Sequence, residues 1–213
     1  MTKKLAIVGA SGHGRVIADI AEILGNWSDI LFYDDKFGSP DFNFEYKVSG
    51  TSANLIDLLK EDPSSMEVAL GIGDNSTRIK FYRTFKNHDV SMPVLMHPRA
   101  VVSKKVVLGQ GTVVMAGAII NPGTTVGDAC IVNSCAVVEH DCQIGTGAHL
   151  SPNATLCGGV AIGEGAWIGA SSVVIQCTSV GRNAVIGAGS TAIKCVEENT
   201  TLVGSPARMV KAR

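Results

Sequence analysis

The adjacent residues His140 and Asp141 are the part of this sequence best suited to acid–base chemistry. A carboxylate beside an imidazole can hold one ring tautomer and leave the second nitrogen free to accept a proton near neutral pH. The pair therefore fits a reaction in which a nucleophile must lose a proton. A single His-Asp pair is more often an ordinary solvated turn, so its function depends on the elements that position it.

A six-residue repeat positions this pair and continues without interruption over residues 96–197. The first position holds a large aliphatic residue in every hexad but the last, and the fifth holds only Ala, Val, Thr, Cys or Ser. These two positions face the same side of an extended chain, so each hexad predicts a strand of four residues. The third and fourth positions carry turn residues such as Gly, Pro and Asn and predict corners.

A short strand and a corner that repeat with one buried face predict a parallel solenoid. The alternative is a sandwich, but sandwich turns come at irregular intervals of roughly 8–12 residues, which a strict period of six does not match. The repeat resembles the left-handed β-helix of the hexapeptide-repeat acyltransferases, which has three walls and three hexads in each coil. The left-handed sense rests on this resemblance, because ordinary parallel crossovers are right-handed.

With three hexads per coil, Gly158 and Gly159 lie directly above His140 and Asp141, and no other corner of the repeat consists of two glycines. We expect empty space above the imidazole and an accessible N–H group on Gly158. That group can stabilise the oxyanion formed when a thioester is attacked. Direct attack by the acceptor needs no acyl-enzyme. Cys142, the nearby thiol, occupies a fifth position and is expected to point into the coil and to be inert.

Asn133, His149 and Trp167 are expected on an outward face, with Trp167 one coil above His149. His140 and His149 are separated by half a coil, which places their backbones on the order of 15 Å apart at about 3 Å per residue. Two histidines at that distance cannot serve one small acetyl group within one chain. If both are catalytic, His140 of one subunit meets His149 of its neighbour, and three such contacts predict a homotrimer.

Residues 1–95 alternate between strands and helices. A strand predicted at residues 5–8 leads into a glycine-rich turn that opens an amphipathic helix and contains Gly9, Ser11, Gly12, His13 and Gly14. Such a turn presents backbone N–H groups and the positive end of the helix to a phosphate. Its spacing, Gly-x-x-Gly-x-Gly, differs from the dinucleotide fingerprint Gly-x-Gly-x-x-Gly. The glycines can also serve only the close packing of strand and helix.

Further polar residues follow the strands predicted at residues 30–33 and 66–72. They are Asp34 and Asp35 after the first strand, and Gly73, Asn75 and Arg78 after the second, where a polar helix begins near residue 76. Ligands of open α/β sheets bind at the carboxyl ends of the strands, so the two carboxylates can accept hydrogen bonds from a ribose or a base. Three strands with crossing helices predict a half-sized Rossmann-like domain, large enough for one nucleotide.

The chain has 213 residues, of which 46% are hydrophobic, and a net charge of −1 at pH 7. It can bury one or two cores, and the change of periodicity predicts domains at residues 1–95 and 96–213. Near-neutral charge argues against a nucleic-acid partner. No apolar run is long enough to span a membrane, and the N-terminus leads into a strand instead of a signal-peptide core. We therefore expect a cytoplasmic protein without membrane contact.

Six cysteines lie between Cys130 and Cys195 without the spacing of metal ligands, so no metal is expected. Cys130 and Cys142 fill buried fifth positions as small apolar side chains. Cys177 and Cys195 stack at one corner, where a disulfide is sterically allowed but unexpected in a reducing cytoplasm.

Over essentially its whole length the sequence resembles the bacterial nucleotide-sugar N-acetyltransferases of the sialic-acid-acetyltransferase-like group (NeuD/PglD-type). The motifs that carry the resemblance are Gly9-Ala10-Ser11-Gly12-His13-Gly14, Asp34-Asp35, Gly71-Ile72-Gly73-Asp74-Asn75, Val138-Glu139-His140-Asp141-Cys142 and Gly204-Ser205-Pro206-Ala207-Arg208. The resemblance implies an α/β N-terminal Rossmann-like domain that binds the nucleotide sugar. It also implies an all-β C-terminal domain, a left-handed parallel β-helix whose terminal loop contacts CoA.

The resemblance also implies roles for single residues. His140 matches the general base, Asp141 its supporting acid and His149 a second active-site histidine. The family often has Glu where Asp141 stands, so here the bond to the imidazole rests on a side chain one methylene shorter. The acceptor sugar nucleotide would contact Gly9, Ser11, Gly12, His13, Gly14, Asp34, Asp35, Gly73, Asn75, Arg78 and Asn133. CoA would contact His149, the Gly158 amide, Trp167, Gly204, Pro206 and Arg208.

The reaction implied is transfer of acetyl from acetyl-CoA to an amine, in particular the 4-amine, of an amino-deoxy sugar linked to UDP, TDP or GDP. Two alternatives stay open. One is O-acetylation of sialic acid or a related sugar on the same fold. The other is a non-catalytic role, as a structural coil or as a nucleotide-binding regulator of surface-polysaccharide synthesis. The sequence leaves the nucleotide, the sugar and the pathway open.

Overall fold

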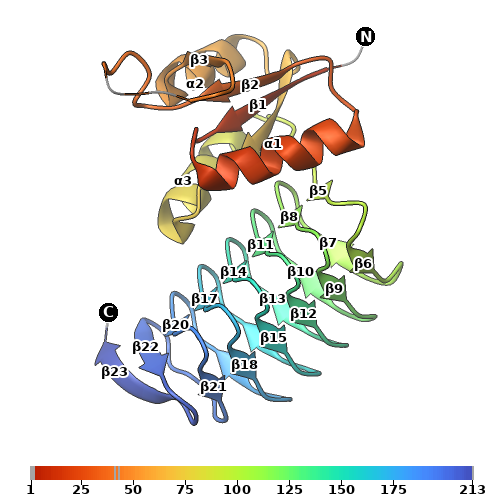
Figure 1. The fold of residues 1–213 in the computed structure, drawn as a ribbon, viewed down its shortest axis with the longest axis vertical. Helices are drawn as coiled ribbons and strands as arrows, with labels where there is room; N and C mark the ends of the chain where they lie inside the picture. The colour runs from red at the N-terminus through yellow and green to blue at the C-terminus, as the bar shows by residue number, and fades with distance from the viewer. Residues whose placement is uncertain (1–2, 41, 43, 213) are drawn as a thin grey trace. The chain divides into compact units, whose positions relative to one another are not determined.

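The chain divides into two compact units, Met1–Leu95 and Met96–Arg213, in the computed structural model (Figure 1). The structure describes residues 3–40, 42 and 44–212. None of the helices within those ranges is long and apolar enough to cross a membrane.

Unit 1 contains a four-stranded parallel sheet in the order β3-β2-β1-β4. Its elements are β1 (Lys4–Val8), α1 (Gly12–Leu24), β2 (Ile30–Tyr33), β3 (Val48–Gly50), α2 (Ser52–Glu61), β4 (Met66–Leu70) and α3 (Asn75–Lys86). The three predicted strands are present, and β4 ends two residues earlier than expected. The prediction missed β3, because a strand of three residues after a long loop has no periodicity to detect.

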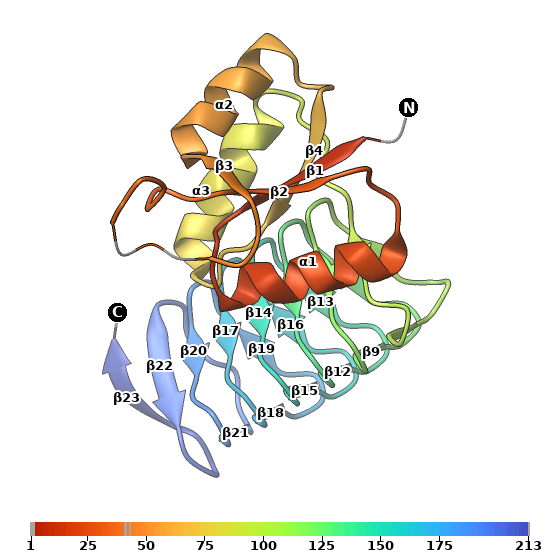
Figure 2. The same ribbon diagram turned by 45° about the horizontal axis from the view of Figure 1, so that its top comes forward.

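The helices of unit 1 cover both faces of the sheet. The chain passes from β1 through α1 to β2 on one side, and from β3 through α2 back to β4 on the other, so right-handed crossovers place α1 and α2 on opposite faces (Figure 2). The order in which the chain adds strands reverses between β1 and β4, which are parallel neighbours. The loops that follow these two strands are therefore neighbours, at the position where open α/β sheets bind ligands.

Unit 2 is a coil of short parallel strands with three walls. Wall 1 contains β5 (Leu95–Met96), β8 (Val113–Val114), β11 (Ile131–Val132), β14 (His149–Leu150), β17 (Trp167–Ile168) and β20 (Val185–Ile186), followed by β22 (Thr200–Val203) and β23 (Arg208–Ala212). Wall 2 contains β6 (Val101–Val102), β9 (Ile119–Ile120), β12 (Val137–Val138), β15 (Thr155–Leu156), β18 (Val173–Val174) and β21 (Thr191–Ala192). Wall 3 contains β7 (Val107–Leu108), β10 (Thr125–Val126), β13 (Gln143–Ile144), β16 (Ala161–Ile162) and β19 (Ser179–Val180).

The register of the walls confirms three hexads per coil, since Val137 pairs with Thr155 and His149 with Trp167. Each repeating strand is two residues long, so the prediction of four was wrong for the paired region. Hydrogen bonds nevertheless reach the flanking positions. The Val137 N–H donates to the Ala154 carbonyl at 2.9 Å, and the Glu139 N–H donates to the Leu156 carbonyl at 3.0 Å. Both ends of each extended segment are therefore tied to the next coil.

The interior of the coil is filled by the first and fifth positions of the hexads, as the repeat predicted. Val138, Cys142 and Leu150 are fully buried examples. At each corner from residue 111 to residue 189 the fourth position has a positive φ, with 60° at Asp141 and 58° at Asn153. Gly, Asn and Asp tolerate this left-handed conformation best, which explains their frequency at the fourth position.

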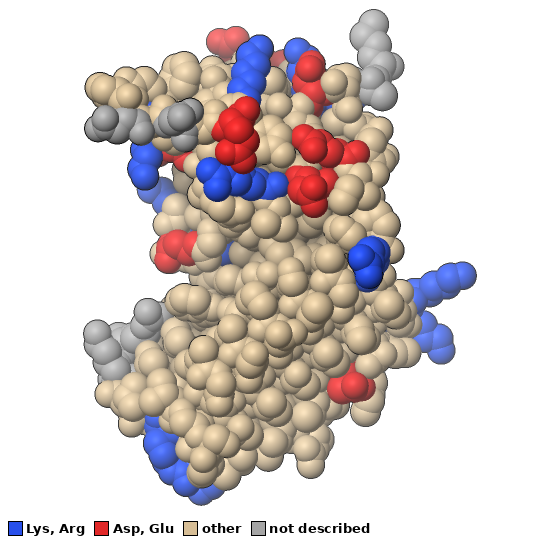
Figure 3. Space-filling view, in the orientation of Figure 1, with Lys and Arg blue, Asp and Glu red and all other residues tan. Residues whose placement is uncertain are grey.

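Charges are sparse along the coil. Between Lys105 and Arg182 the sequence has no Lys or Arg, and its acidic residues there are Asp128, Glu139, Asp141 and Glu164. Figure 3 shows the visible side of unit 2 as largely uncharged away from its ends. An anionic ligand that lies along this coil can therefore find basic side chains only toward an end.

Candidate active site

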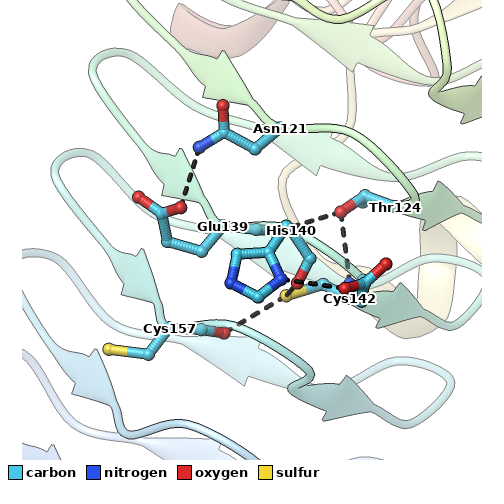
Figure 4. Close-up of polar contacts among 7 residues, drawn as sticks. Asn121, Thr124, Glu139, His140, Cys142 and Cys157 are labelled. Atoms are coloured by element: carbon cyan, nitrogen blue, oxygen red, sulfur yellow. Dashed lines mark hydrogen bonds and ion pairs between the residues drawn. The ribbon is translucent and has the colours of Figure 1, made fainter.

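His140 lies at the corner between β12 and β13, where walls 2 and 3 meet (Figure 4). Its Nδ1 is 2.8 Å from Oδ2 of Asp141, and both side chains are exposed. The shorter Asp side chain thus reaches the imidazole. When the carboxylate accepts the Nδ1 hydrogen, Nε2 is left as the proton acceptor. The pair has the geometry of an oriented general base instead of an unstructured turn.

Gly158 stands one coil beyond His140, but the space between them is occupied. A Cβ added to Gly158 would lie 2.7 Å from His140 Nε2 and 2.8 Å from Cε1. The expectation of empty space above the ring was therefore wrong, because the imidazole itself fills it, and a glycine is what permits the ring to lie there.

The amide groups of this double-glycine corner have different uses. The Gly159 N–H donates to the His140 carbonyl at 2.9 Å, while the Gly158 N–H has no acceptor among the residues that the structure describes. A free N–H group beside Nε2 can stabilise an oxyanion next to the base.

Cys142 is fully buried, and its Sγ lies 3.3 Å from the Cys157 carbonyl oxygen, to which it donates. Burial raises the pKa of the Cys142 thiol. A protonated thiol inside the coil is not a nucleophile, so the predicted inertness of Cys142 agrees with its environment. Cys177 and Cys195 are both exposed and unbridged.

A second polar group lies on the outer face of wall 1. Asn133 Nδ2 is 3.1 Å from Nε2 of His149, and the His149 ring stacks on Trp167 with centroids 6.0 Å apart and planes 6° apart. The Trp167 indole N–H donates to Ser151 Oγ at 2.7 Å. These contacts fix the His149 ring in one orientation. The sequence predicted Trp167 above His149 and Asn133 on an outward face, and the structure adds that Asn133 contacts His149.

His140 and His149 of one chain face different directions. The corner that carries His140 joins walls 2 and 3, whereas His149 projects from wall 1, the side of the triangular coil opposite that corner. As their spacing in the sequence predicted, the two histidines do not form one site within a chain.

The glycines of unit 1 divide into two groups. A Cβ on Gly9 would lie 2.7 Å from the Gly71 carbonyl oxygen, and a Cβ on Gly71 would lie 2.9 Å from Gly14 Cα. Gly9, Gly14 and Gly71 thus serve close packing, as the alternative interpretation of the motif suggested. Gly12 and Gly73 have nothing within 4 Å of the Cβ position, so their surroundings are open to a ligand.

Arg78 was predicted to contact the nucleotide, but its side chain is 1% exposed. It donates to the carbonyl oxygens of Ile72 and Gly73, both at 3.0 Å, and to Asn75 Oδ1 at 2.8 Å. A buried guanidinium bound to its own loop shapes that loop. Arg78 therefore positions the loop around Gly73 instead of making the direct ligand contact expected of it, and Asn75 Oδ1 is one of its partners.

His13 and Ser11 lie between the two loops. Ser11 Oγ donates to the Gly71 carbonyl at 3.1 Å. Burial, together with the charge of Arg78, lowers the pKa of His13 to about 4. Its Nε2 is buried and has no hydrogen-bond partner within the described residues. His13 is therefore neutral at physiological pH.

The two carboxylates after β2 also differ. Asp34 accepts the Ala10 N–H on Oδ2 and the Lys36 N–H on Oδ1, each at 2.9 Å. Among the residues that the structure describes, Asp35 accepts hydrogen bonds only on Oδ1, from the N–H and the hydroxyl of Ser52. Asp34 thus holds the glycine-rich turn in place, while Asp35 Oδ2 accepts no hydrogen bond from the described residues and is open to a ligand.

A cavity of about 290 Å³ lies at the C-terminal end of the coil, between the last hexad and the β22–β23 hairpin. Lys194 and Arg208 both line it, together with Ile193 and Met209. The loop that contains Gly204 and Pro206 connects the two strands of the hairpin, and the Gly204 N–H donates to Ser190 Oγ at 2.9 Å.

Sequence reasoning missed Lys194. The signal was the period of the corner, because His140, Gly158, Gln176 and Lys194 occupy the third position after successive wall 2 strands. Among the described residues no group of three His, Cys, Asp or Glu side chains could hold a metal ion.

Comparison with known proteins gives the same division of the chain. Residues 4–85 match the PglD N-terminal domain family, and residues 159–193 match the bacterial transferase hexapeptide repeat. A curated relative, UDP-N-acetylbacillosamine N-acetyltransferase of Bacillus subtilis (strain 168), is 37% identical over 114 residues, which cover 54% of this chain. The match spans about half of that relative, 52% of its length.

Solved structures match over the full length. The acetyltransferase domain of PglB from Neisseria gonorrhoeae FA1090 in complex with acetyl coenzyme A is 36% identical, covers 99% of this chain and 100% of that chain, and gives a TM-score of 0.91. PerB from Caulobacter crescentus in complex with CoA and GDP-perosamine is 32% identical over 99% of both chains, with a TM-score of 0.89. The chain thus belongs to the bacterial sugar N-acetyltransferases that join a PglD N-terminal domain to a left-handed hexapeptide-repeat β-helix.

Proposed function

We propose that this protein transfers acetyl from acetyl-CoA to an amine, in particular the 4-amine, of an amino-deoxy sugar linked to a nucleoside diphosphate. The observation that carries the proposal is the His140 corner, where Asp141 holds Nδ1 and Gly158 of the next coil lies against Nε2. The names of the relatives support it, since one is an acetyltransferase bound to acetyl coenzyme A and another a protein bound to CoA and GDP-perosamine.

The reaction is direct attack on the thioester. The lone pair of the sugar amine attacks the thioester carbonyl, and the oxyanion that forms accepts the Gly158 N–H. His140 Nε2 removes the proton that the new C–N bond makes acidic, while Asp141 stabilises the resulting imidazolium. The C–S bond then breaks, and the CoA thiolate takes the proton from His140. Two solved structures of the perosamine N-acetyltransferase from Caulobacter crescentus have one histidine replaced, by Asn in one and by Ala in the other.

Acetyl-CoA would lie along the corner from His140 toward the terminal cavity. Three coils separate His140 from Lys194, about 14 Å at a strand spacing of about 4.8 Å. The pantetheine arm has roughly the chain length of four amino-acid residues, about 14 Å when extended. A thioester beside His140 therefore brings the phosphates of CoA to Lys194 and Arg208. In the other direction along this corner, the nearest basic residue is Lys104. It is only two coils from His140, on the side of the ring where Asp141 lies.

The nucleotide of the acceptor would bind unit 1. Gly12 and Gly73 offer open backbone at the ends of β1 and β4, and the N-terminus of α1 favours a phosphate there. Asp35 offers one carboxylate oxygen to a ribose or a base. UDP, TDP and GDP all fit this description, and the relatives are named for UDP- and GDP-linked sugars.

The opposite placement of His140 and His149 supports a homotrimer with shared sites if both histidines act on one acetyl group. In a threefold arrangement the His140 corner of one subunit meets wall 1 of its neighbour. Asn133, His149 and Trp167 of that wall would then contact the acceptor and the acyl group. We place the reaction in the cytoplasm, where acetyl-CoA is made.

The test is an assay of CoA release with a panel of UDP-, TDP- and GDP-linked 4-amino sugars and their 4-hydroxy counterparts. The proposal predicts CoA release with at least one amino sugar and a product heavier by one acetyl group, with amide linkage in its NMR spectrum. Turnover of hydroxy sugars alone would indicate an O-acetyltransferase. Binding of nucleotide sugars without any CoA release would indicate a regulatory protein.

A further inference from the structure

Glu139, the residue before His140, carries a carboxylate that has no role in the proposed mechanism. It occupies the second position of its hexad, on the outer face of wall 2, and is half-buried. Its Oε2 accepts the Asn121 amide at 2.9 Å, and Figure 4 shows the side chain extended toward Asn121. The carboxylate is thus held in a fixed position on the residue that precedes the base, on the side of the preceding coil.

Within residues 3–40, 42 and 44–212, no Lys, Arg or His forms an ion pair with this carboxylate. The ion pairs among the described residues do not include Glu139, and its side-chain partner Asn121 is neutral. The second carboxylate at the corner, Asp141, is bound to His140. With no Lys or Arg in the sequence between Lys105 and Arg182, the stretch of coil that carries His140 has a net negative charge. Such a site attracts a cation.

The acceptor supplies that cation if the proposed function holds. A primary amine carries a proton near neutral pH, whereas a sugar hydroxyl is neutral. From these observations we infer that Glu139 binds the ammonium group of the acceptor and so makes this corner select amino sugars over hydroxy sugars. This inference rests on the proposed function and names the residue that decides between N- and O-acetylation.

The proton balance is simple. The acceptor binds as R–NH3⁺, with one N–H donated to Glu139. One proton leaves to solvent before attack, because only the free amine has a lone pair for the carbonyl carbon. The second proton goes to His140 after the C–N bond forms. Glu139 forms no covalent bond and ends in the state in which it began, so it is a binding residue that determines specificity.

The plain alternative is that Glu139 only ties two coils together through Asn121. Glu139→Gln separates the two roles, because the amide oxygen of Gln can still accept the Asn121 N–H while the charge is lost. Glu164→Gln makes the same charge change at another corner of the coil and serves as the control. Melting temperatures of both variants report the structural role.

Binding is measured by calorimetry without acetyl-CoA, so the result does not depend on turnover. The probes are GDP-perosamine and the UDP- and TDP-linked 4-amino sugars of the panel, each with its 4-hydroxy counterpart. The probe pair is the one whose amino sugar binds the unmodified protein most tightly. We expect Glu139→Gln to weaken binding of the amino sugar roughly 10- to 100-fold, the worth of a hydrogen bond between charged groups. Binding of the hydroxy sugar should change less than twofold, and Glu164→Gln should leave both unchanged.

Equal losses for the amino and hydroxy sugars, or no loss for either, would overturn the role of Glu139. A fall in melting temperature that accompanies equal losses would identify the structural alternative. Failure of the proposed function looks different, because then no sugar in the panel releases CoA whatever stands at position 139. In the active protein the variant should also lower the ratio of amine to hydroxyl turnover.

Discussion

The imidazole of His140 occupies the place that a side chain on Gly158 would fill, with Nε2 2.7 Å from the position of the missing Cβ. The two residues come from successive coils, so the parallel register of walls 2 and 3 sets their distance. The base and the amide that would bind the oxyanion are thereby held together by the repeat itself.

Gly158→Ala should lower kcat by about 10²-fold, since the methyl group displaces Nε2 and a displacement near 1 Å can cost that much. The coil should fold normally, because other corners have Ala at the same third position of the hexad, namely Ala116, Ala170 and Ala188. In addition, Gly158 has no positive φ. Steady-state kinetics and circular dichroism test both statements. Unchanged kcat would show that the position of the ring does not matter.

His140→Ala should lower kcat by about 10²–10⁴-fold, the usual contribution of a positioned general base. The fold should survive because the side chain is exposed. Cys142→Ala is the matched comparison in the same corner and should keep most of its activity, since the thiol is buried and protonated. Loss of turnover in Cys142→Ala together with a trapped acetyl-protein would replace direct attack by an acyl-enzyme.

Lys194→Ala should raise the KM for acetyl-CoA roughly three- to tenfold, as expected for loss of one exposed charge contact to a phosphate. The effect should shrink at high ionic strength, and Lys194→Arg should restore the wild-type value. Lys104→Ala is the control, because Lys104 occupies the same corner on the other side of His140. A larger effect from Lys104 than from Lys194 would reverse the direction assigned to CoA.

His13 should make stability depend on pH. Its pKa is lowered to about 4 in the folded protein, from an ordinary value of 6.5, by burial and by Arg78. Between those values the unfolded chain binds more protons, so stability falls as the pH drops from about 6.5 to 4, by up to about 3 kcal/mol. Urea unfolding at several pH values should show a smaller decrease in His13→Gln than in the unmodified protein. Parallel curves would place the His13 ring in water.

Periodicity predicted the parts of this structure that repetition determines. The coil, its buried first and fifth positions and the relation of Gly158 to His140 all follow from a six-residue repeat without insertions. The prediction failed where packing depends on single contacts. The sequence does not reveal that Arg78 turns back onto its own loop, that Asp34 is used by the Ala10 and Lys36 amides, or that Gly9 and Gly14 face backbone while Gly12 faces open space.

The central claim is that His140 of one subunit works with His149 of the next. It is tested most directly by mixing His140→Ala and His149→Ala subunits, each inactive alone, after partial unfolding and reassembly. In random trimers about one quarter of the interfaces would carry both histidines, so the account predicts recovery of about a quarter of wild-type activity. Mass spectrometry of the intact assemblies verifies mixing, and verified mixed trimers without any recovered activity would contradict the account.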